Sequence, residues 1–120
     1  MYITREEFAE YSPLEIPSDE FRVLASRASD VVDVLTLYAI ESEGGVEALP
    51  LLDRVQVKKA VCAEVQYLYE QGGLDAFDYG SVSIGKFSAS GAGVQRVSGL
   101  PVAPLVIPYL SKTGLTYRGR

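Results

Sequence analysis

The side chains that most often carry chemistry are scarce in this chain, which has no histidine and a single cysteine, Cys62. Without histidine, the commonest general base at neutral pH and the commonest metal ligand are both missing. Cys62 lies between small and apolar residues of an expected helix, and nothing in the sequence would activate its thiol, so it is interpreted as a packed core residue. The sequence therefore predicts a protein that is not an enzyme.

Two pairs of carboxylates have a spacing that could bind a divalent cation. Asp30 and Asp33 lie three residues apart on one face of an expected helix, and Asp75 and Asp78 repeat that spacing near a loop. Two ligands without a third and a fourth make a poor site, so both pairs are interpreted as solvated. We expect neither a metal nor another cofactor.

Glu64 is the acidic residue whose position stands out. Helical spacing places it inside an apolar stripe rather than on the polar side of its helix. A carboxylate there needs a cationic or amide partner, either within the monomer or across a subunit interface. Both possibilities stay open from the sequence, and Glu64 is predicted to be a buried or interface charge rather than a catalytic one.

A glycine-rich segment, GAGVQR at residues 91–96, begins like a dinucleotide-binding motif. It lacks the last glycine of G-x-G-x-x-G, and neither a proper strand before it nor a helix after it is evident. We interpret the segment as part of a flexible linker over residues 88–99.

Charge is divided between two parts of the chain. Residues 1–78 contain 16 acidic and six basic residues, a formal charge of −10, whereas residues 79–120 contain five basic residues and no acidic one. The five cations are widely spaced and the overall pI is about 4.7, which disfavours direct nucleic-acid binding. A basic segment that docks on an acidic protein surface, such as a neighbouring copy, is the favoured interpretation.

The elements that must position these groups are mainly helical. Thr4 and Glu7 form a capping-box pattern that predicts a helix of about two turns, ending before Pro13. A long helix is expected from Ser18, acting as N-cap, with an apolar stripe that runs to Ala39. The residues placed on the polar face of that helix are Arg22, Ser26, Ser29, Asp30 and Asp33.

A second long helix is predicted from about Leu52 to Gln71, with a terminating glycine pair at Gly72. The loop between the two long helices contains Gly44 and Gly45, so the helices form an antiparallel hairpin. Val82–Phe87 is expected to be a short strand. Prolines limit any helix that follows to a short one at residues 104–112, which Thr113 and Gly114 would end.

The fold class is therefore a small, mainly α-helical bundle: a short N-terminal helix, a hairpin of two long helices, a protruding strand or loop and an extended C-terminal arm. Residues 1–78 form the helical body, and residues 79–120 the protrusion and assembly arm. The core is expected to come from the first two-thirds of the chain. No apolar run approaches the ~20 residues that span a membrane, and the start lacks a signal-peptide pattern, so a cytoplasmic site of synthesis without membrane contact is expected.

Three stretches resemble the head–tail connector (adaptor, or head-completion) proteins of long-tailed bacteriophages. The first is ITREEF at residues 3–8 with PSDEF at 17–21, and the second is VKKAVCAEVQYL at residues 57–68. The third and most specific is VSIGKFS at residues 82–88 with TGLTYRG at 113–119, which is similar to the S-I-G-x-F-S and T-G-L-x-Y-R-G patterns of connectors from phages of Gram-positive hosts.

The resemblance implies a structural subunit that forms a ring of about twelve copies beneath the portal protein. Such a ring extends the DNA channel, receives a stopper or tail-completion protein on its other face, and lets genomic DNA pass without sequence-specific binding. It would be assembled in the host cytoplasm and reside in the virion at the head–tail interface. The residues expected to contact a neighbouring subunit or the portal are Val82, Ile84, Lys86, Phe87, Leu115, Tyr117, Arg118 and Arg120. Two alternatives remain: a small adaptor that forms no ring, and a helical DNA-binding regulator with a basic tail.

Overall fold

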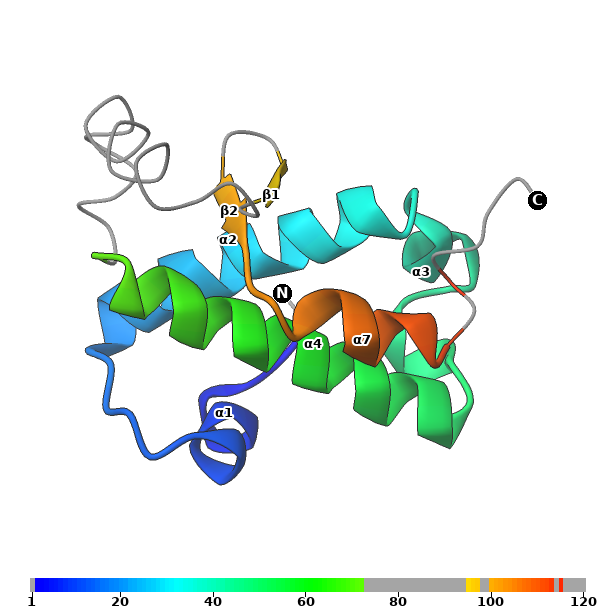
Figure 1. The fold of residues 1–120 in the computed structure, drawn as a ribbon. Coiled ribbons are helices and arrows are strands. Elements are labelled where there is room, and N and C mark those ends of the chain that lie inside the picture. The colour runs from blue at the N-terminus through cyan, green and yellow to red at the C-terminus, as the bar shows by residue number, and fades with distance from the viewer. Residues whose placement is uncertain (1, 73–94, 98–99, 114, 116–120) are drawn as a thin grey trace.

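The computed structural model of the protein describes residues 2–72, 95–97, 100–113 and 115 (Figure 1). These residues form five α-helices, one 3-10 helix and a two-stranded hairpin. The prediction of a mainly helical bundle is confirmed.

Helix α1 (Arg5–Tyr11) forms where the capping box predicted it. The Glu7 amide donates to Thr4 Oγ1 at 3.1 Å, and the Thr4 amide donates to Glu7 Oε1 at 2.9 Å. The helix stops at Ser12, because the residue before a proline disfavours helical geometry. Phe8 points into the core and packs at a tilt against Phe21 of the next helix, with ring centroids 5.6 Å apart.

Helices α2 (Ser18–Leu35) and α4 (Leu51–Glu70) form the predicted hairpin and pack against each other. Their apolar stripes meet along the core, with Leu24, Val32, Val57 and Val61 fully or almost fully buried. Gly72, at a φ of 124°, follows α4 as its terminating residue. The prediction that Ser18 caps α2 is wrong, because Ser18 is the first helical residue and Pro17 precedes it without a side-chain cap.

The apolar stripe that was predicted to run to Ala39 does not belong to one continuous helix. Thr36 ends α2, its hydroxyl donating to the Val32 carbonyl at 2.9 Å, and Leu37 and Tyr38 adopt left-handed backbone angles. This reversal turns Ile40 back into the core as part of α3 (Ala39–Ser42), which the 3-10 helix η1 (Val46–Ala48) follows. Burial of Ile40 thus outweighs the helical spacing of the apolar residues. The side chains of Leu37 and Tyr38 are exposed to solvent as a result.

Strands β1 (Gln95–Val97) and β2 (Leu100–Val102) pair antiparallel and lead into helix α7 (Val106–Ser111), which packs on α4. The short helix was predicted correctly, but the interpretation of residues 95–97 as linker is wrong. The prediction that the core comes only from the first two-thirds of the chain is also wrong. The later residues that join the core are Val102, Ala103, Val106, Leu110 and Leu115.

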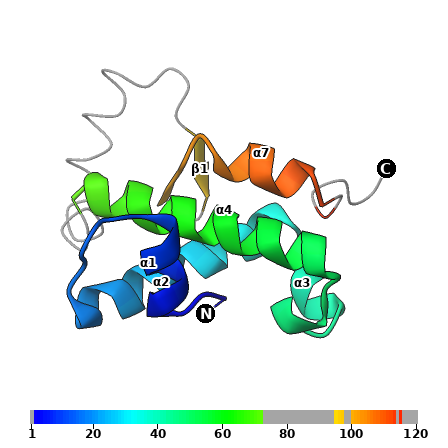
Figure 2. The ribbon, with the colours of Figure 1, turned by 90° about the horizontal axis from the view of Figure 1, so that it is seen from below.

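Helix α4 lies between α7 on one side and α1 and α2 on the other (Figure 2). Six consecutive residues, 60–65, are buried, which is the pattern of a helix covered all round. The central position of α4 explains why a few apolar residues after residue 100 are needed: they cover its second face. The predicted strand at residues 82–87 and the boundary at residue 78 lie outside the described residues.

Candidate interaction surface

Of the predicted contact residues, only Leu115 is among those that the structure describes; Val82, Ile84, Lys86, Phe87, Tyr117, Arg118 and Arg120 are outside them. Leu115 is only 7% exposed, and its amide donates to the Thr113 hydroxyl at 3.0 Å. It therefore contributes to the core of its own monomer. A contacting arm would have to begin after Leu115.

Glu64 is fully buried on the face of α4 that β2 and α7 cover. Its Oε1 accepts the Ala103 amide at 2.7 Å, whereas Oε2 has no hydrogen-bond partner among the described residues. Burial raises the pKa of Glu64 to about 7, against the opposing effect of the amide bond. The amide partner is thus supplied within the monomer, where it ties α4 to the segment between β2 and α7.

Asp33 departs from the expectation of a solvated pair with Asp30. Asp30 is exposed, but Asp33 is 7% exposed and its carboxylate accepts the Tyr2 hydroxyl, while the Tyr2 amide donates to Ser29 Oγ at 3.0 Å. Burial raises the pKa of Asp33, and the nearby carboxylate of Glu41 adds to the effect. Ser29 and Asp33 are buried because the N-terminal segment covers this side of α2, which the pattern of α2 alone did not indicate.

Lys58 of α4 links its own helix to α1 and to η1. Its Nζ lies 2.6 Å from Glu7 of α1 and 3.0 Å from Glu47 of η1. Burial favours the neutral acid at Glu7, but the bonds from Lys58 and Thr4 outweigh it and lower the pKa of Glu7. These charges are used to hold the fold together, since their partners come from separate helices.

Two tyrosines bridge the face of α4 between α1 and α7. The Tyr11 and Tyr109 hydroxyls are 3.2 Å apart and their rings meet edge to face. Cys62 is buried next to this bridge, and burial raises the pKa of its thiol to about 12, so it stays protonated at neutral pH. This agrees with the interpretation of Cys62 as a packed residue.

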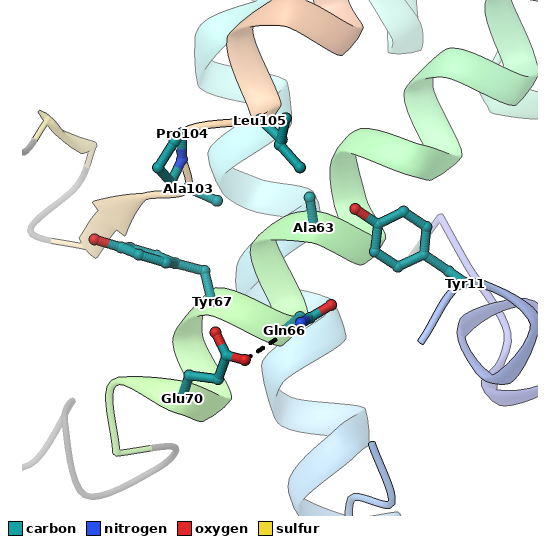
Figure 3. A pocket seen from close by; sticks show the side chains of 8 residues that line it. All are labelled: Tyr11, Ala63, Gln66, Tyr67, Glu70, Ala103, Pro104 and Leu105. Carbon is teal, nitrogen blue, oxygen red and sulfur yellow. Dashed lines mark hydrogen bonds between the residues drawn. The ribbon is translucent and has the colours of Figure 1, made fainter. Parts of the chain in front are cut away.

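Two shallow hollows are each lined in part by Tyr11. One, of about 200 Å³, is lined by Tyr11, Ala63, Gln66, Tyr67, Glu70, Ala103, Pro104 and Leu105 (Figure 3). The other, of about 280 Å³, is lined in part by Glu10, Val55 and Lys59. Both fall below the range of roughly 300–1,000 Å³ that is usual for small-molecule sites.

Exposed apolar side chains gather at the closed end of the hairpin. Of the seven large apolar residues that are exposed in the described part of the chain, five come from the end of α2 and the start of α4: Leu37, Tyr38, Leu51, Leu52 and Val55. We call these five residues the hairpin-end patch. Figures 1 and 2 both place α3 and the start of α4 at this same end of the molecule.

The described residues contain no group of three or more carboxylates or cysteines placed to hold a metal ion. Within the same residues, no helix is long and apolar enough to cross a membrane. Comparison of the chain with protein-family models, curated proteins and solved structures finds no match.

The sequence pattern did not predict the hairpin-end patch. Tyr38 was part of a regular apolar stripe, and only the left-handed turn after Thr36 places it at the surface together with Leu37. Leu51 and Leu52 carried a weak signal, because two adjacent leucines cannot both face the core of one helix.

Proposed function

We propose that this protein is a structural head–tail connector subunit, which forms a ring beneath a phage portal, extends the DNA channel and joins the capsid to the tail. The observation that carries the proposal is the third sequence resemblance, VSIGKFS with TGLTYRG, on a mainly helical body. The hairpin-end patch adds support, since exposed apolar side chains that gather at one end of a molecule are typical of protein–protein contacts.

The distribution of charge fits the same role. All 16 acidic residues precede residue 79, and exposed ones such as Glu6, Glu10 and Glu15 lie on or next to α1. Carboxylates along a channel repel DNA phosphates, so DNA slides rather than binds. The five basic residues between positions 86 and 120 of one copy would then face an acidic surface of another copy or of the portal.

The test is the mass of the assembly formed by the purified protein, alone and mixed with portal protein, together with negative-stain images of the mixture. We expect a closed ring of about twelve copies, formed at least in the presence of portal. A protein that stays monomeric and does not bind portal refutes the proposal. Duplex DNA provides the control for the regulator alternative, which requires binding that weakens steeply with salt.

A further inference from the structure

We propose that β1, β2 and α7 form a pH-controlled cover, which is closed on α4 while Glu64 is protonated and opens once Glu64 has lost its proton. We call these three elements the C-terminal layer. Opening exposes the second face of α4, whereas the contact between α2 and α4 is kept. The inference goes beyond the proposed function and does not depend on it.

Glu64 lies where the C-terminal layer meets α4. Its side chain is fully buried, its Oε1 accepts the Ala103 amide at 2.7 Å, and its Oε2 has no hydrogen-bond partner among the described residues. A single amide does not replace the hydration of a carboxylate, so the buried neutral acid is much favoured over the buried anion. Burial accordingly raises the pKa of Glu64 to about 7. Ionisation of Glu64 therefore opposes closure of the layer.

The described side chains of the C-terminal layer bring no charge to Glu64. Residues 95–113 contain only two charged residues, Arg96 and Lys112. Lys112 is exposed, and the side chain of Arg96 is outside the described part of the structure. Tyr109 of α7 is also titratable, but its hydroxyl lies 3.2 Å from that of Tyr11 on α1.

The helices beneath the layer do not compensate a charge on Glu64 either. Within one turn of Glu64 on α4, the titratable residues are Cys62 and Tyr67. Helix α1 contributes Glu7, which pairs with Lys58. The charged residues of α2 are Asp19, Glu20, Arg22, Arg27, Asp30 and Asp33. None of these side chains contributes to the raised pKa of Glu64, which comes from burial and is opposed by the Ala103 amide.

The C-terminal layer depends on its contact with α4 for its own structure. Strands β1 and β2 have three residues each and α7 has six. Helices shorter than about 12 residues and single hairpins are marginal in water on their own. Val102, Val106 and Leu110 bury their side chains in the core that α4 shares with the layer. The layer is therefore expected to open as one unit when it leaves α4.

Helices α2 and α4 keep their mutual contact when the layer opens. Figure 2 shows α7 and α1 on opposite sides of α4, so the α1 side stays covered. Among the described helices, α2 and α4 share the most extensive contact. Phe8 of α1 also packs on Phe21 of α2. These contacts do not involve residues 95–115.

A hollow opens along part of the contact between α4 and the layer. The hollow of about 200 Å³ is lined by Ala63, which precedes Glu64, and by Ala103, which donates to it (Figure 3). Pro104 and Leu105 line the same hollow and are exposed. A small displacement of the layer at this edge would bring solvent to the carboxylate, which favours the ionised form.

The experiment measures native-state hydrogen exchange of the full-length, nitrogen-labelled protein by NMR between pH 5 and pH 8, with each rate divided by the intrinsic rate at that pH. The amides of Ala103, Val106 and Tyr109 report on the layer, and those of Val61 and Val65 on α4. The layer amides should exchange faster than the α4 amides at every pH and depend less on added urea, because opening exposes less surface than unfolding does.

The pH dependence follows from the two states of Glu64. With a pKa of about 7 in the closed state and 4.5 in the open state, the opening constant of the layer should rise about 70-fold from pH 5 to pH 8. Glu64→Gln should abolish this rise. Glu10→Gln, which neutralises an exposed acid on α1, is the matched control and should follow wild type. Arg96→Gln should also follow wild type.

Three outcomes overturn the inference. Equal protection and equal urea dependence of the layer and α4 amides in wild type would show that the layer does not open separately. Parallel pH profiles of wild type and Glu64→Gln would show that Glu64 does not control opening. An altered profile in Arg96→Gln would show that a charge on β1 shares in the control. The first outcome needs no variant, so the inference stays testable even if Glu64→Gln fails to fold.

Discussion

Replacement of Glu64 by glutamine should remove a large part of the pH dependence of stability. Burial raises the pKa of Glu64 from its ordinary value of 4.5 to about 7 in the folded protein. The folded state therefore holds this proton more tightly than the unfolded state does. Its contribution to stability is complete below pH 4.5 and is lost as the pH rises through the folded pKa near 7.

The magnitude follows from the size of the shift. Each unit of pKa difference corresponds to about 1.4 kcal/mol, so wild-type protein should lose about 3 kcal/mol between pH 4.5 and pH 8 through this one group. Glutamine keeps an oxygen that can accept the Ala103 amide but does not ionise. Glu64→Gln should therefore gain about 3 kcal/mol relative to wild type over that range, whatever the offset between the two proteins at pH 4.5.

The assay is urea unfolding at several pH values, monitored by far-ultraviolet circular dichroism. Midpoints are compared only where the free energy of unfolding of both proteins depends equally on urea concentration. Other groups titrate in both proteins, so the difference between the two curves isolates Glu64. Glu10→Gln, at an exposed position on α1, is the control and should follow wild type. Parallel pH profiles for wild type and Glu64→Gln would refute the reasoning, because they would show that the Glu64 carboxylate is solvated in the folded protein.

Three further predictions concern the N-terminal contact, the strained turn and the cysteine. Tyr2→Phe leaves the buried Asp33 carboxylate without its hydroxyl donor and should lower the free energy of unfolding by roughly 1–3 kcal/mol; an unchanged urea midpoint would contradict this. Leu37→Gly relieves a left-handed angle at a small entropic cost, so thermal stability should stay equal or rise by up to about 1 kcal/mol, and a clear loss would show that Leu37 packs within the monomer. Cys62 should react with a thiol reagent at pH 8 only after urea unfolds the protein; rapid reaction of the native protein is the contrary result.

Local patterns predicted the helices well because the interactions that set them are close in sequence. The capping box at Thr4 and Glu7, the proline after Ser12 and the glycine after α4 act within a few residues of one another. Position in an apolar stripe was also sufficient to single out Glu64 as a buried or interface charge. It could not name the partner, because the Ala103 amide lies 39 residues away.

The sequence by itself determined the two long helices, their pairing and the segregation of charge, since helical period and net charge are properties of the chain before it folds. Only the tertiary structure decided which segments cover each face of these two helices. Residues 100–115 join the core because α4 has a second face to bury, and the N-terminal segment buries Asp33. Leu37 and Tyr38 are exposed because burial of Ile40 requires the chain to reverse there. Each of these outcomes depends on the competition between segments for the same buried surface, which no single segment encodes.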